Sequence, residues 1–178
     1  MNESLMISTE RMPVDRPYLL LELLPQQPYQ LLQEVFSTLS RCDRLKEFLL
    51  HWLQQFKIER SSSDEQNELQ APLDEFYFAL LNLIDALHRI KEEKSMLIVQ
   101  EFCRRYSQIF TRRELWCFMH AVFHDAVDKP STFLPGPALD WYEQVLALTE
   151  AAYVLDGKVS IENRFRSEEH TSELQSPI

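Results

Sequence analysis

Glycine is the residue that most constrains this chain, because only two occur among its 178 residues, Gly136 and Gly157. Phosphate-binding loops, dinucleotide-binding turns and tight hairpins need glycine where the backbone takes a positive φ or approaches a ligand closely. Two isolated glycines complete none of the common nucleotide-binding or serine-hydrolase motifs. A helical chain needs glycine mainly at helix C-termini, so this scarcity favours an all-α fold.

Apolar side chains recur every three to four positions over most of the chain, which is the pattern of amphipathic helices. Proline, serine and charged clusters separate the apolar stretches. We therefore predict an irregular, single-domain bundle of about six or seven helices. The predicted helices span residues 18–24, 29–39, 43–56, 72–90, 95–110, 112–127 and 141–157.

Local signals predict several helix ends. Thr111 and Glu114 have the spacing of a capping box, so the sixth predicted helix should start immediately after Thr111. Pro72 suits the first turn of the fourth helix, and Ser95 can cap the fifth. Gly157 is expected to end the seventh helix.

The polarity of the chain suggests its organisation. Residues 1–14 are polar and unpatterned, and are expected to form a mobile lead-in to a helical domain over residues 15–157. A hydrophilic stretch over residues 59–70 is expected to be a linker inside that domain. Residues 158–165 are too short a segment to classify.

The sequence of the C-terminal residues indicates that they have an unusual origin. Residues 166–176 resemble, over eleven consecutive positions, the in-frame translation of a common sequencing adapter. Such a scar is excluded from fold reasoning. We therefore expect residues 166–178 to be non-native, and the natural C-terminus to continue differently past Phe165.

Charge and hydropathy limit the partners and the compartment. The formal net charge is −10, which argues against non-specific nucleic-acid binding, although the pairs 104–105 and 112–113 are Arg-Arg and could form a local basic patch. The apolar run 19–24 is too short to span a bilayer, and the N-terminus lacks a signal-peptide pattern. These features predict a cytoplasmic protein without a membrane segment.

The three cysteines, Cys42, Cys103 and Cys117, are an odd number without paired spacing. Each lies within or beside an apolar helical pattern, which predicts buried, reduced thiols. Cys117 lies between Trp116 and Phe118, where an apolar environment should raise its pKa. No cofactor motif accompanies these cysteines.

One candidate site for a metal or a small ligand follows from helical spacing. His120, His124 and Asp128 are four residues apart, so a helix would project two imidazoles and a carboxylate from nearly one stripe. The chain has no further motif to complete four ligands. The alternative interpretation is a histidine pair that faces solvent or is satisfied within the fold.

One candidate catalytic pair lies on the same predicted helix. Arg113 and His120 are separated by six residues. This spacing resembles the R-x(4–6)-H signature of HEPN-type ribonucleases, a family of small helical proteins. The resemblance implies that Arg113 would bind phosphate and His120 would assist attack by the RNA 2′-hydroxyl. The alternative is an exposed arginine at a helix start and an unrelated histidine.

The aromatic content is the remaining indication of function. Phe78 and Phe118 lie off the apolar stripes of their predicted helices, so part of the surface could face a protein partner or a second copy. The alternative is a helix that is buried on several sides. Our leading interpretation is a non-catalytic interaction or regulatory protein, with a homo-oligomer as one form of that interaction.

Overall fold

The computed structural model of the chain describes residues 27–60, 66–128 and 135–173. These residues form six helices and no strand, which confirms the predicted all-α class. The helices are α2 (Pro28–Val35), α3 (Leu39–Arg60), α4 (Gln66–His88), α5 (Glu93–Arg105), α6 (Gln108–Asp128) and α7 (Pro135–Glu173).

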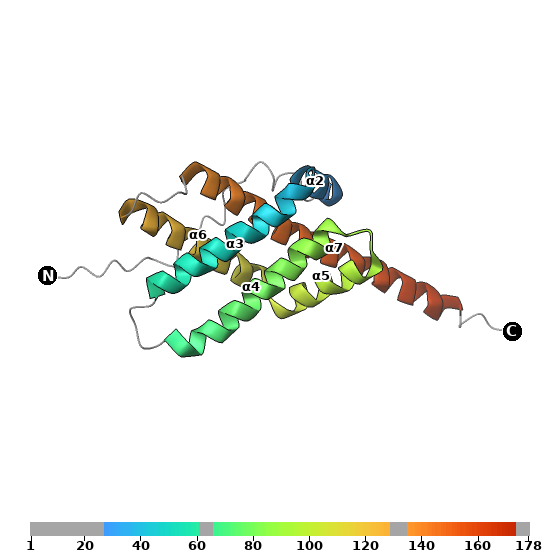
Figure 1. Cartoon of the computed structure of the whole chain (residues 1–178). Helices are drawn as coiled ribbons and strands as arrows, with labels where there is room; N and C mark the ends of the chain where they lie inside the picture. The colour runs from blue at the N-terminus through green and yellow to red at the C-terminus, as the bar shows by residue number, and fades with distance from the viewer. Residues whose placement is uncertain (1–26, 61–65, 129–134, 174–178) are drawn as a thin grey trace.

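The helices pack as an irregular bundle around α7. Figure 1 shows α3 and α4 side by side and antiparallel at the front, with α6 and α7 behind them. Helix α3 packs on α6, α4 packs on both α3 and α5, and α6 packs on α7. Helix α7 also contacts α2, α3, α4 and α5, so it touches every other described helix.

The centre of the core is aromatic. Phe76 on α4 is fully buried, and its ring centroid lies 5.0–6.4 Å from four other rings. These distances suit edge-to-face and tilted aromatic packing. The four rings belong to Phe102, Tyr106, Phe110 and Phe118.

Phe118 is 0% exposed, so the suggestion that it faces a partner is wrong. Phe56 on α3 and Phe76 on α4 both contact its ring. Helix α6 is covered by α3 on one side and by α7 on another, which buries residues outside a single apolar stripe. The alternative of a helix buried on several sides therefore holds for α6.

The first described helices differ from the prediction at their ends. Helix α2 ends at Val35, four residues before the predicted end, and α3 already begins at Leu39. Arg41 donates from Nη1 to the backbone carbonyl of Glu34 at 3.1 Å, which satisfies a carbonyl in the last turn of α2. The helix predicted over residues 18–24 lies outside the described residues.

The linker predicted over residues 59–70 overlaps the ends of two described helices. Helix α3 continues to Arg60 and α4 begins at Gln66, so both ends of this stretch are helical. Pro72 therefore lies inside α4 rather than in its first turn. Proline removes one helical hydrogen bond. Pro72 is exposed to solvent.

Helix α5 begins two residues earlier than its predicted cap. Its N-cap is Glu92, whose side chain makes no capping hydrogen bond. Ser95 is buried in the first turn, and its backbone N–H donates to the carbonyl of Glu92 at 3.0 Å. The prediction that Ser95 caps this helix is wrong, because the helix already begins at Glu93, within the charged stretch that precedes Ser95.

Helix α6 also begins before its predicted start. The hydroxyl of Ser107 accepts a hydrogen bond from the backbone N–H of Phe110 at 3.2 Å, which is an N-cap geometry. Thr111 lies inside the helix, and its N–H donates to the carbonyl of Ser107 at 3.0 Å. The predicted capping box of Thr111 and Glu114 is therefore wrong, because Ser107 offers the same chemistry one turn earlier.

Helix α7 passes through its predicted end at Gly157 and continues to Glu173. Gly157 does not adopt a positive φ, so it does not act as a helix terminator. A glycine inside a helix costs only about 1 kcal/mol relative to alanine, which flanking helix formers can offset. Residues 158–165, which the sequence left unclassified, are part of this helix.

Candidate functional site

Arg113 is engaged by its neighbour in α6. Its Nε and Nη2 atoms donate to Oε1 of Glu114 at 3.1 and 3.0 Å. The guanidinium carbon also lies 5.2 Å from the centroid of the Phe110 ring. The group that the HEPN resemblance assigns to phosphate binding is therefore held by a carboxylate and an aromatic ring.

His120 lies two turns after Arg113 on the same helix and is half-buried. Its ring centroid is 6.5 Å from that of Trp116, at a tilt of 49°. The predicted helix is confirmed, since α6 is continuous from Gln108 to Asp128. The structure places both residues on one helix, two turns apart.

The proposed metal ligands are only partly described. His120 has a described side chain, whereas the side chains of His124 and Asp128 lie outside the described part of the chain. Within the described residues, no three histidine, cysteine, aspartate or glutamate side chains gather in a way that could hold a metal ion.

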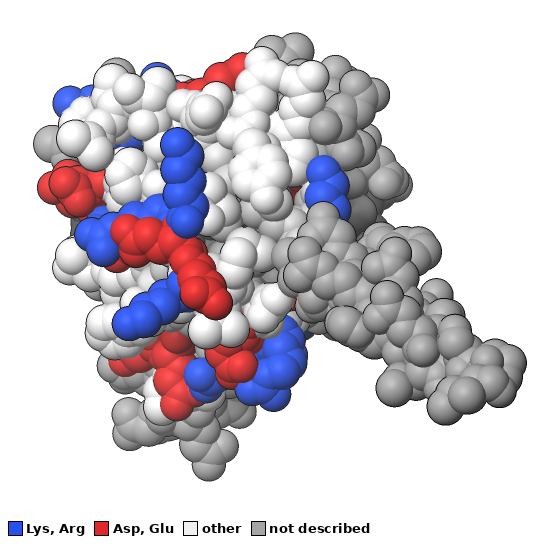
Figure 2. All heavy atoms as spheres, turned by 90° about the vertical axis from the view of Figure 1, so that its right-hand side faces the viewer, with Lys and Arg blue, Asp and Glu red and all other residues white. Residues whose placement is uncertain are grey.

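The four arginines considered for a basic patch each pair with a glutamate. Arg104 pairs with Glu101 within α5, and Arg105 of α5 pairs with Glu75 of α4. On α6, Arg112 pairs with Glu150 and Arg113 with Glu114. Figure 2 shows one face of the molecule on which Lys and Arg side chains lie beside Asp and Glu side chains. These pairs oppose the positive potential that phosphate binding requires.

None of the three cysteines forms a disulfide, and the predicted burial holds fully for Cys42 only, since Cys103 and Cys117 are partly buried. Burial raises the pKa of Cys42 to about 11, and the nearby Asp85 carboxylate adds to the shift. Burial also raises the pKa of Cys103 to about 12. Nucleophilic cysteines need a lowered pKa, so these two thiols do not have the character of nucleophiles.

A polar cluster that the sequence did not reveal joins α6 to α7. Glu150 on α7 is only 7% exposed and accepts a hydrogen bond from Nε2 of Gln108. Nε of Arg112 lies 3.3 Å from the other carboxylate oxygen. Burial raises the pKa of Glu150, and Arg112 and Gln108 offset part of that rise.

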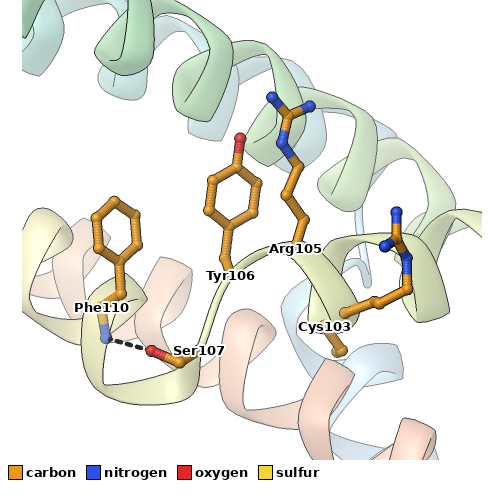
Figure 3. A pocket seen from close by; sticks show the side chains of 6 residues that line it. Cys103, Arg105, Tyr106, Ser107 and Phe110 are labelled. Atoms are coloured by element: carbon orange, nitrogen blue, oxygen red, sulfur yellow. Dashed lines mark hydrogen bonds between the residues drawn. The ribbon is translucent and has the colours of Figure 1, made fainter.

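The turn between α5 and α6 borders an open depression of about 560 Å³. Figure 3 shows three side chains that project towards α4: Arg105 from the end of α5, Tyr106 from the turn and Phe110 from the start of α6. The hydroxyl of Tyr106 is buried and has no hydrogen-bond partner among the described residues. Both arginines that line the depression, Arg104 and Arg105, are already paired with glutamates.

Two ion pairs link α3 to α4, and one alignment of the two helices forms both of them. Nζ of Lys46 lies 3.0 Å from Oδ1 of Asp85, and Nζ of Lys57 lies 2.6 Å from Oδ1 of Asp74. Eleven residues separate the two lysines and eleven separate the two aspartates, which is about three helical turns. Antiparallel helices with this spacing bring both ion pairs into contact together.

Between the two ion pairs, each helix carries two apolar residues on the same face as its charged residues. Together they form one row on each helix, in which successive residues are four, three and four positions apart. We call these eight residues the α3–α4 seam. They are Lys46, Leu50, Leu53 and Lys57 of α3, and Asp74, Phe78, Leu81 and Asp85 of α4.

The middle of the seam is apolar and partly open to solvent, because Leu53 is buried at 4% exposure whereas the other three apolar residues reach the surface. The register set by the ion pairs brings Leu50 level with Leu81 and Leu53 level with Phe78. Leu50 is 42% exposed and Phe78 is 61% exposed, while Leu81 is half-buried. The predicted exposure of Phe78 is therefore confirmed, and it belongs to an apolar surface framed by charges.

None of the helices in the described part of the chain combines the length and apolar character that a membrane span requires. Comparison with known proteins adds no family: no protein-family model, no curated protein and no solved structure matches this chain.

Proposed function

We propose that this chain is a non-catalytic protein-interaction module that docks through the α3–α4 seam. The observation that carries this proposal is the exposure of Leu50 and Phe78 between two Lys–Asp ion pairs. Protein interfaces combine a central apolar or aromatic anchor with a polar rim. Phe78 would be that anchor, and the ion pairs would form the rim.

The environment of the side chains that could have carried out chemistry gives separate support for a non-catalytic function. Arg113 is bonded to Glu114, and burial raises the pKa of Cys42 and Cys103. Arg112 and Glu150 pair in the interior, where they join two helices. The Arg112–Glu150 pair thus contributes to the packing of α6 on α7.

A binding experiment with matched variants tests the proposal. The full chain, Phe78→Glu and Ile109→Glu are used as baits in a cell extract, and association with any protein, including a second copy, is measured. Ile109 is exposed at the start of α6, outside the seam, so Ile109→Glu controls for the added charge. We expect Phe78→Glu to weaken association about tenfold or more and Ile109→Glu to leave it unchanged. Equal association of all three proteins would contradict the proposal.

A further inference from the structure

The charges of the seam are segregated by helix. Both lysines, Lys46 and Lys57, belong to α3, and both aspartates, Asp74 and Asp85, belong to α4. Each ion pair involves Oδ1 of its aspartate, and a carboxylate can accept further donors through its other lone pairs. The side chains are 29–51% exposed, so they remain accessible to charged groups of another molecule.

This segregation makes the seam complementary to itself in one orientation. Two copies can meet face to face around a two-fold axis that runs along the helices, which places α3 of each copy over α4 of the other. Positions along the helices are preserved by that axis. Lys46 of one copy therefore lies level with Asp85 of the second copy, and Lys57 lies level with Asp74.

The other face-to-face orientation is unfavourable. A two-fold axis that runs across the helices places α3 over α3, in antiparallel directions. Lys46 then lies over Lys57 of the second copy, and Asp74 lies over Asp85. Like charges placed opposite each other are repulsive, so the charge pattern selects the first orientation.

The apolar residues agree with the first orientation. The same overlap brings Leu50 of each copy level with Leu81 of the other. Leu53 is buried in its own bundle, so Phe78 adds apolar surface beside this contact and does not pack on Leu53 of the second copy. Beyond the seam, Asp43 lies one turn before Lys46 on α3, and Arg89 lies one turn after Asp85. Both are exposed and carry opposite charges, so the overlap places them level with each other at that end, although Asp43 also lies 3.6 Å from Nζ of Lys46 in its own chain.

From these relationships we infer that the partner of the α3–α4 seam is a second copy of this chain, with α3 of each copy packed along α4 of the other. The inference rests on the proposed function and specifies its partner. Burial of Leu50 and Phe78 would supply the apolar centre of the interface. The lysines and aspartates would fix the orientation of the two copies.

A charge-exchange experiment tests the inference with the full chain. One variant, Lys46→Asp with Lys57→Asp, places acidic residues on both rows of the seam. The other, Asp74→Lys with Asp85→Lys, places basic residues on both rows. Sedimentation equilibrium should give the wild type twice the 21.2 kDa mass of one chain. Each variant alone should be monomeric, and an equimolar mixture should recover the double mass.

The mixture separates a specific interface from a loss of folding. Circular dichroism first establishes that each variant is helical, and a merely destabilised bundle would not regain the dimer mass on mixing. A wild type that stays monomeric up to about 0.1 mM would overturn the inference. So would a mixture that stays monomeric although both variants are folded.

The two proposals can fail separately. If the wild type is monomeric but binds another protein through Phe78, the second-copy inference fails and the proposed function stands. If neither a second copy nor another protein depends on Phe78, both fail.

Discussion

The hydroxyl of Tyr153 on α7 donates a hydrogen bond to the backbone carbonyl of Tyr106, at 2.9 Å, across 47 residues of sequence. Its oxygen also lies 2.7 Å from Oγ1 of Thr111, and because its single proton is already used, Thr111 is the donor in that pair. Burial raises the pKa of Tyr153 to about 12, so the phenol remains protonated at neutral pH. The Tyr153 side chain thus connects the turn between α5 and α6 to α7 through hydrogen bonds.

Removal of this hydroxyl should destabilise the bundle. We expect Tyr153→Phe to lower the free energy of unfolding by about 1–3 kcal/mol, because it leaves the Tyr106 carbonyl and the Thr111 hydroxyl without this partner. Urea unfolding followed by circular dichroism measures the difference. Tyr29→Phe is the matched control, since Tyr29 is exposed on α2. Equal losses in both variants would show that the hydroxyl of Tyr153 has no special role.

The aromatic core should depend strongly on Phe76. Phe76→Ala removes a fully buried ring that contacts four other rings, and should cost about 3–5 kcal/mol. Phe78→Ala, two positions along α4, should change the stability of the monomer by only about 0.5 kcal/mol. Thermal and urea unfolding at a concentration where the chain is monomeric compare the two variants. A reversed order would mean that the core is placed wrongly.

The buried Glu150 predicts a specific pH dependence. Its folded-state pKa is raised above that of an ordinary glutamate, chiefly by burial. Its contribution to stability is therefore complete below the ordinary pKa and is lost as the pH rises through the folded-state value. The Glu150→Gln variant keeps an acceptor for Gln108 but cannot titrate.

The stability of the wild type relative to Glu150→Gln should accordingly increase as the pH falls from about 7 to about 4. Urea unfolding of both proteins over a pH series measures this difference, and all other titrating groups are common to both. A constant difference, or one that decreases on acidification, would be inconsistent with the raised pKa.

The sequence predicted the helical class and the position of most helices, because amphipathic periodicity is encoded locally. It predicted helix ends less well. Thr111 and Glu114 formed a plausible capping box, yet Ser107 caps α6 and Thr111 bonds to Tyr153 instead. Gly157 was expected to end α7, which passes through it. Tertiary contacts decide between such competing local signals.

The candidate site was predictable only in part. The off-stripe position of Phe78 indicated exposure, and the structure confirms it. Phe118 gave the same sequence signal but is buried by α3 and α4. The seam could not be predicted, because its two ion pairs depend on the register of two antiparallel helices. Equal spacing of Lys46 and Lys57, and of Asp74 and Asp85, was the one signal in the sequence that could have indicated it.

The nuclease hypothesis makes a different prediction from the proposed function. If Arg113 is held by Glu114 for structural reasons, the purified chain should leave single-stranded RNA intact, and His120→Ala should behave as the wild type. Gel electrophoresis of end-labelled RNA after incubation with each protein measures cleavage. RNA cleavage by the wild type that His120→Ala abolishes would establish the nuclease hypothesis instead.

Hydroxyl-radical footprinting tests the central claim most directly, because it measures the exposure of individual side chains in solution. We expect oxidation of Leu50 and Phe78 to fall as the protein concentration rises, since each becomes covered by the seam of a second copy. Ile109, which is exposed outside the seam, should keep the same oxidation rate at every concentration. Unchanged oxidation of Leu50 and Phe78 over a range that extends to about 0.1 mM would contradict self-association through the seam.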